Sequence, residues 1–201
     1  MKWCSKQYFA LKASLPYLKF GEKPAISRGR FLEYCEAFLG ERDLAFLRKL
    51  SLAAPEEIPG NDSAEAEFLR YETALRNAVL LMRSGARGVK GDLPLREGDG
   101  KSSPEEASDV IARLQASADP LEREKILDRA RWARLEDLES GRFADLDALG
   151  IYCRKLLILE KWERFQEDKA GRNLEEAVSA VGKEAHEEAA AAGKAEMKKE
   201  S

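Results

Sequence analysis

Apolar residues recur at every third or fourth position along most of this 201-residue chain, and this spacing is the feature that most constrains its fold. The spacing matches one face of an α-helix, whereas a half-buried strand alternates apolar and polar residues. It is clear in the stripe formed by Leu149, Tyr152, Leu156 and Leu159. No stretch of strand length alternates in the other way between turn residues. The sequence therefore predicts an all-α protein and leaves only residues 1–20 open.

Cap residues signal where the helices begin and end. Candidate N-caps stand at Ser27, at Asp62 or Ser63, at Ser103, at Asp119, and at Asp145 or Asp147. Glycines that can end a helix stand at Gly40, Gly85, Gly141 and Gly171. These signals predict a helical bundle of about six to seven helices, in which the two short helices on either side of Gly40 form a hairpin. Residues 8–15 are apolar and end at Pro16, which fits either a short helix or an extended arm.

A long glycine-rich segment separates two parts of the chain. Residues 84–103 contain five glycines and Pro94, and a loop of this length inside a compact chain is either functional or mobile. We predict an N-terminal helical half at residues 1–84, a Gly-rich loop at 85–103 and a C-terminal helical half at 104–183. Residues 184–201 are mostly Ala, Glu and Lys, with little apolar surface to bury, which predicts a frayed tail.

Charge and hydropathy argue against several classes of partner. The 34 basic and 37 acidic residues nearly cancel, and a net charge of −3 produces no general attraction to nucleic acid. The longest apolar run, at residues 156–159, is far shorter than a membrane span, and the first residues lack the apolar stretch of a signal peptide. We therefore expect a cytoplasmic protein that binds no nucleic acid and reaches a membrane only indirectly, through partners.

The motifs that would support catalysis or nucleotide binding are incomplete. Residues 98–102 resemble the tail of a P-loop, but Leu95 stands where that loop requires glycine, and no strand precedes it. His186 is the only histidine and lies in the tail, where nothing would orient it beside a nucleophile. Carboxylates between residues 136 and 147 are better explained as caps and solvated groups than as an acid–base pair. We predict that the protein is not an enzyme and holds no cofactor.

The three cysteines do not form a metal-binding pattern. Cys4, Cys35 and Cys153 are far apart in the sequence and include no CxxC pair. A zinc site of four Cys or His ligands would need all three together with His186. The sequence therefore favours reduced thiols, with Cys35 and Cys153 packed as small apolar side chains, and no metal.

Trp132 and its neighbouring arginines are the candidate contacts with a partner. Large aromatic side chains dominate both protein cores and the centres of interfaces. Trp132 lies between Arg131 and Arg134. Leu127, Leu135 and Leu138 share one face of the predicted helix, and Trp132 does not fit that face as well. It is therefore either a half-buried core residue or, with Arg131 and Arg134, a contact with another protein chain.

Several passages resemble a known group of proteins. They comprise Asp119-Pro120-Leu121-Glu122, Ile126-Leu127-Asp128 with Arg131-Trp132, and residues 149–162 with Tyr152 and Lys155-Leu156-Leu157-Ile158-Leu159-Glu160. These resemble the C-terminal part of the C (or d) subunit of V/A-type ATPases, an adaptor protein of their central stalk. The chain is even more similar to a small uncharacterised bacterial family encoded in V-type ATPase operons, which residues 8–16, 31–35 and 71–77 also resemble.

The resemblance implies a non-catalytic role in ion or proton transport. The stalk adaptor of these ATPases is funnel-shaped and stands between the rotor shaft and the membrane ring. Shaft and ring are therefore the implied partners, and the inner face of the membrane is the implied location. The adaptor is appreciably longer, with three related helical domains, and this chain would be a reduced version of it. The alternative is a generic helical interaction or assembly protein without any ATPase, and a third is an enzyme with a carboxylate metal site.

Overall fold

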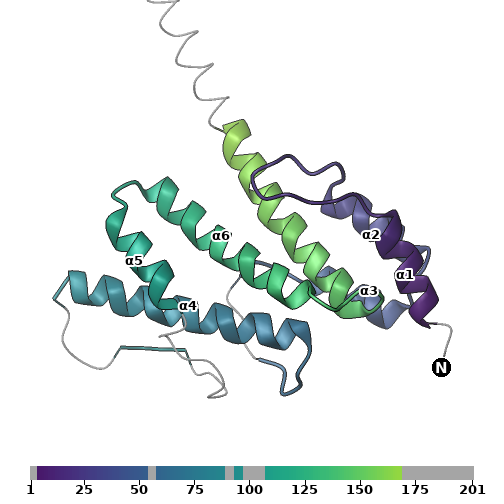
Figure 1. Cartoon of the computed structure of the whole chain (residues 1–201), viewed down its shortest axis with the longest axis horizontal. Helices are drawn as coiled ribbons and strands as arrows, with labels where there is room; N and C mark the ends of the chain where they lie inside the picture. The colour runs from purple at the N-terminus through teal and green to yellow at the C-terminus, as the bar shows by residue number, and fades with distance from the viewer. Residues whose placement is uncertain (1–3, 54–57, 89–92, 97–106, 169–201) are drawn as a thin grey trace, which may run out of the picture. The chain divides into compact units, whose positions relative to one another are not determined.

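The computed structural model describes residues 4–53, 58–88, 93–96 and 107–168, with side chains from residue 7 onward, and within these ranges the regular secondary structure is helical. The helices are α1 (Cys4–Ser14), α2 (Arg28–Glu36), α3 (Glu41–Lys49), α4 (Ala64–Ala86), α5 (Ser108–Ala116), α6 (Pro120–Glu139) and a seventh at residues 146–168 (Figure 1). The predicted all-α class, with about six to seven helices, is confirmed.

The predicted caps account for most helix boundaries. Side-chain oxygens of Ser27, Ser63, Asp119 and Asp145 each accept a hydrogen bond from a backbone N–H two or three residues further on. Soon after α6 ends, Gly141 adopts a φ of +80°, which glycine tolerates without the steric cost of a Cβ. Helix α4 runs one residue past Gly85. Helix α5 begins at Ser108, and its predicted cap at Ser103 lies outside the described residues.

The first residues, which the sequence left open, form a helix. Leu11 is fully buried and Tyr8 nearly so, and the Tyr8 hydroxyl donates to the Asp43 carboxylate of α3. The Ser14 hydroxyl donates to the carbonyl of Leu11, 2.7 Å away, where the helix ends ahead of Pro16. Contacts with other elements therefore stabilise a segment whose local sequence fits two conformations.

The chain divides into two compact units, residues 1–160 and residues 161–201. Of the second unit the structure describes residues 161–168, which are helical. There the rings of Trp162 and Phe165 pack with centroids 5.6 Å apart, and the Lys161 ammonium lies 5.9 Å from the Trp162 ring centroid.

One core of the first unit lies where α4, α5 and α6 meet (Figure 1). Its buried members are Leu75, Ala78, Ala107, Leu114 and Leu127. Helix α4 comes before the glycine-rich segment and packs against two helices that follow it. The predicted division at residues 85–103 stays a prediction, because most of that segment lies outside the described residues.

The helix from residue 146 to residue 160 lies at the centre of the first unit. Every residue from 148 to 156 is buried, as expected for a helix that is apolar on more than one face. The Tyr152 ring packs 5.3 Å from the Phe31 ring of α2, and its hydroxyl donates to the carbonyl of Pro16 at 2.9 Å. A Cβ on Gly150 would lie 3.4 Å from the Phe46 ring, so glycine here permits close packing against α3.

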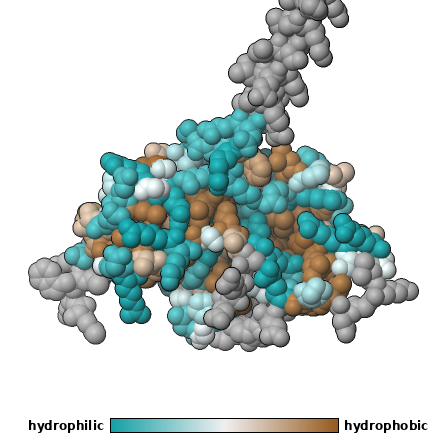
Figure 2. Space-filling model, turned by 180° about the vertical axis from the view of Figure 1, so that it is seen from behind, coloured by the Kyte–Doolittle hydropathy of each residue, from teal (hydrophilic) through white to brown (hydrophobic). Residues whose placement is uncertain are grey.

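Apolar surface reaches the exterior in patches between hydrophilic side chains (Figure 2). The most exposed large apolar side chains are Tyr17, Phe143 and Phe9. Of the helices that the structure describes, none combines the length and the apolar character that a membrane crossing requires.

Candidate functional site

Arg131 joins two helices inside the molecule. Its Nε donates to Oε2 of Glu72 on α4 at 2.8 Å, and Nη2 donates to Oε1 of the same carboxylate at 3.0 Å. Nη1 donates to Oδ1 of Asp128 at 2.7 Å. Burial lowers the pKa of Arg131, but the two carboxylates outweigh it, and the net shift is upward. The Arg131 guanidinium therefore serves as a bidentate tie between α4 and α6.

Trp132 lies in the core, with 4% of its surface exposed. Its Nε1 donates to Oε1 of Glu136 at 2.9 Å, and the Phe20 ring meets it edge-on with centroids 5.6 Å apart. The Lys155 ammonium lies 5.2 Å from the Trp132 ring centroid. Of the two alternatives for this residue, the geometry favours a core position, and a contact through Trp132 would require the surrounding segments to move.

Arg134 is the predicted contact residue that reaches the surface. About a third of its side chain is exposed, one guanidinium nitrogen lies 3.6 Å from Glu67, and the Tyr71 ring lies 5.9 Å away. Arg134 lines an open groove of about 340 Å³ beside α5. The charged residues of that groove are Asp109, Arg113, Arg129, Arg134 and Asp137.

A second open groove, of about 630 Å³, lies at the far end of α4. We call it the arginine groove; its lining consists of Leu81, Met82, Arg83, Gly85 and Ala86 from α4, the C-cap residue Arg87, Gln115 from α5 and Arg123 from α6. The lining holds three arginines and no acidic side chain. The candidate contacts predicted from the sequence do not include the residues of this groove. The pair Arg83 and Arg87, four residues apart on one helix without an intervening acid, was a signal for it.

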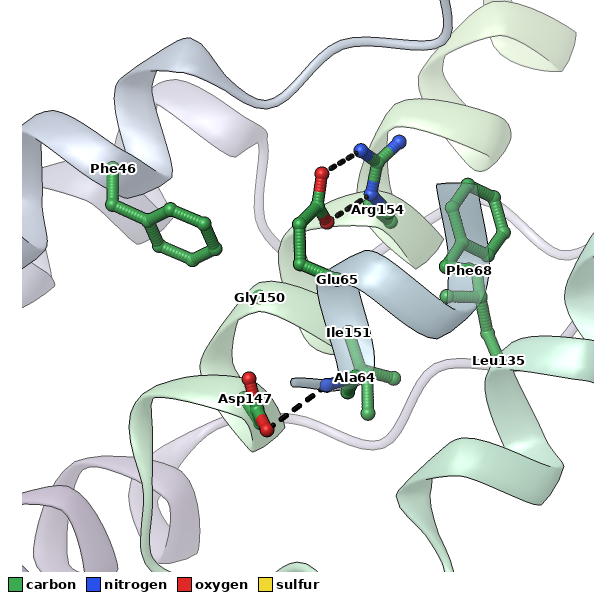
Figure 3. A pocket seen from close by; sticks show the side chains of 9 residues that line it. All are labelled: Phe46, Ala64, Glu65, Phe68, Leu135, Asp147, Gly150, Ile151 and Arg154. Carbon is green, nitrogen blue, oxygen red and sulfur yellow. Dashed lines mark hydrogen bonds and ion pairs between the residues drawn. The ribbon is translucent and has the colours of Figure 1, made fainter. Parts of the chain in front are cut away.

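A small cavity in the middle of the first unit has no room for a substrate (Figure 3). Its volume of about 10 Å³ is that of roughly one water molecule. Arg154 donates to both oxygens of Glu65 and, at 2.7 Å, to the carbonyl of Ser51, while Oδ2 of Asp147 accepts from the backbone N–H of Ala64 at 3.0 Å. Figure 3 shows the side chains of Glu65, Asp147 and Arg154 around the cavity. Their hydrogen bonds connect separate elements of the fold.

The buried thiols are poor nucleophiles. Burial raises the pKa of Cys35 to about 12, and it raises the pKa of Cys153 despite the opposing effect of nearby Arg28. A thiol with a raised pKa is protonated at neutral pH, and the thiolate is the reactive form. Both cysteines are free and buried, as the sequence predicted, and the Cys4 side chain lies outside the described residues.

Within the described ranges, no group of three or more His, Cys, Asp or Glu side chains is arranged to hold a metal ion. The incomplete P-loop at residues 98–102, His186 and the predicted tail at 184–201 lie outside those ranges. Comparisons of the chain with protein-family models, with curated proteins and with solved structures found no match.

Proposed function

We propose that this chain is a non-catalytic accessory protein of a V/A-type ATPase, a reduced relative of the stalk adaptor between rotor shaft and membrane ring. The proposal starts from the resemblance of residues 8–16, 31–35, 71–77, 119–132 and 149–162 to proteins of that group. The remaining support comes from where those residues lie in the fold.

The observation that carries the proposal is that the resembling segments contact one another. Glu72 of the third segment binds Arg131 of the fourth, and Trp132 of the fourth lies under the ammonium of Lys155 in the fifth. Tyr152 of the fifth donates to the carbonyl of Pro16 in the first. Residues separated by up to 136 positions thus form one connected set. A likeness in segments that contact one another is what a shared fold would produce.

The arrangement of the polar groups supports a role in assembly rather than in chemistry. Several buried or largely buried charged groups join helices: Glu72, Asp128 and Arg131 join α4 to α6, and Arg154 joins the central helix to α4. Both open grooves combine arginines with apolar side chains, and the first also holds Asp109 and Asp137, a mixed lining that suits contact with another protein.

Affinity purification from native membranes tests the proposal. A chromosomally tagged copy at native level should recover proteins of the rotor shaft or of the membrane ring, and an untagged strain should recover neither. Recovery of no ATPase protein, with the tagged chain intact, would overturn the proposal. Recovery of other proteins reproducibly and in fixed ratio would favour the alternative, a helical assembly protein unconnected with an ATPase. A position of the gene among ATPase genes would favour the first function over the second.

A further inference from the structure

The lining of the arginine groove has an excess of positive charge, although the chain as a whole is slightly acidic. Its lining carries three arginines and no carboxylate, in a chain whose net charge is −3. Three other arginines of α4 and α6 have acidic neighbours: Arg76 and Arg131 bind Glu72, and Arg134 lies beside Glu67. Among the described residues, no carboxylate lies within ion-pair distance of Arg83, Arg87 or Arg123.

The local structure explains only part of this charge. Arg83 lies in the last turn of α4 and Arg87 caps its end, where cations interact favourably with the helix dipole. Arg123 lies in the opposite situation, near the first turn of α6, where a cation is disfavoured. The Nε of Arg123 donates to the carbonyl of Ser117 at 2.8 Å, which holds the guanidinium in place near the groove.

An apolar side chain accompanies the arginines. Leu81 lines the groove with 41% of its surface exposed, and Met82 beside it packs partly against the core of α4, α5 and α6. Leu121, two residues before Arg123, is 47% exposed. A single exposed leucine is ordinary, but here it shares a groove with three guanidinium groups that no described carboxylate neutralises. The groove can therefore bind a ligand that presents carboxylates and an apolar side chain together.

The N-terminus of α6 adds no phosphate site to this surface. A phosphate site at a helix N-terminus uses free backbone N–H groups, and at α6 the N–H of Leu121 is already bonded to Oδ1 of Asp119 at 3.0 Å. The Asp119 carboxylate would also repel a dianion at that end. The binding groups that remain are the arginine side chains, and the planar fork of each can bind one carboxylate.

We propose that the arginine groove is the docking site for an acidic, amphipathic helical segment of a partner protein. Two carboxylates of that segment, a turn apart on one face, pair with Arg83 and Arg87, which have the same i, i+4 spacing on α4. An apolar side chain between them covers Leu81, and Arg123 closes the opposite side. Such a site serves the ATPase association proposed above or any other helical partner, and it stands without that association.

Selection from a displayed library of random peptides tests the proposal with the full chain as the target. The expected result is enrichment of sequences with Asp or Glu at i and i+4 and a large apolar residue between them. Synthetic, fluorescently labelled versions of the enriched peptides are then titrated against Arg83→Glu/Arg87→Glu and, separately, Arg123→Glu. We expect the double variant to bind at least about tenfold more weakly, since each charged hydrogen bond contributes that much or more.

A matched double variant provides the control. Arg42→Glu/Lys49→Glu makes the same change in charge on the exposed surface of α3 and should bind the peptides like the wild type. Circular dichroism establishes that each variant folds. Peptides in which the acids are changed to Lys should regain binding to Arg83→Glu/Arg87→Glu, a result that simple misfolding cannot produce. The proposal would be overturned if the selection yielded no ligand or only ligands without acidic residues. It would also be overturned if both double variants weakened peptide binding equally. Arginine-dependent binding to phosphatidylserine vesicles without any to the peptides would overturn it as well.

Discussion

The middle and the end of α4 use arginine in opposite ways. In the middle, Arg76 shares the buried Glu72 carboxylate with Arg131 of α6, and the Nε atoms of the two arginines lie 2.5 and 2.8 Å from the oxygens of that carboxylate. At the end, Arg83 and Arg87 line an open groove with no acid beside them among the described residues. Residue type and helix are the same in both places. The difference teaches that a carboxylate shared with a second element makes an arginine part of the connection between helices.

The largest expected effect comes from removing the shared carboxylate. Glu72→Gln removes the buried negative charge that Arg76 and Arg131 share, and breaking a buried ion pair costs about 3–5 kcal/mol. Urea unfolding followed by circular dichroism measures the loss. Glu124→Gln, at a carboxylate 39% exposed and 3.9 Å from Arg131, is the control and should change the free energy of unfolding by less than about 0.5 kcal/mol. Equal effects of the two variants would mean that burial of the carboxylate is unimportant.

The same conservative substitution at a buried and at an open arginine tests the contrast directly. Arg131→Lys keeps the charge but loses the two-nitrogen contact with Glu72, which should cost about 1–3 kcal/mol. Arg87→Lys, in the groove, should leave the free energy of unfolding within about 0.5 kcal/mol of the wild type. Both are measured in the same urea titration. A destabilised Arg87→Lys would indicate that Arg87 already has a structural partner.

A third charged contact joins Glu139 to Lys12 and Lys155, and its contribution to stability depends on pH. Burial opposes ionisation of Glu139, but hydrogen bonds from Lys12 and Lys155, at 2.6 and 2.5 Å, outweigh it and lower its pKa below the usual 4.5. Because the folded-state pKa is the lower one, ionised Glu139 stabilises the protein above about pH 4.5, and this contribution is lost as the pH falls through the folded-state pKa.

The free energy of unfolding of the wild type should therefore fall toward that of Glu139→Gln on acidification. Urea titrations at several pH values between neutrality and about pH 3 measure the difference between the two proteins. Glu36→Gln, at a half-exposed carboxylate paired with Arg48, serves as the comparison and should follow the wild type closely. A gap between wild type and Glu139→Gln that stays constant in acid would contradict the lowered pKa.

The smallest effect on stability is expected in the arginine groove. Arg83→Glu/Arg87→Glu opposes the dipole at the end of α4, which costs up to about 1 kcal/mol and removes no packed contact. Thermal unfolding should show a shift of a few degrees, while binding of acidic peptides falls far more. Collapse of the fold in this variant would show that the two arginines are structural, as Arg131 is.

Much of the local structure could be predicted from the sequence. Ser27, Ser63 and Asp119 cap the helices at which they were expected, because a cap depends on an oxygen and an N–H two or three residues apart. The buried stripe of the helix at 146–160 followed from its apolar spacing. Residues 4–14 could not be assigned in this way, because their helix depends on contacts such as Tyr8 with Asp43, 35 positions away.

The candidate site shows more clearly what could not be predicted from the sequence. The helices, their caps and the incomplete catalytic motifs could be predicted from the sequence, because each depends on residues that are close together in the chain. The same local view grouped Arg131, Trp132 and Arg134 as candidate contacts. Packing in three dimensions was needed to show that Arg131 and Trp132 face inward while the arginine groove stays open. Glu72 and Arg131 are 59 positions apart, and their pairing arises only when α4 packs against α6.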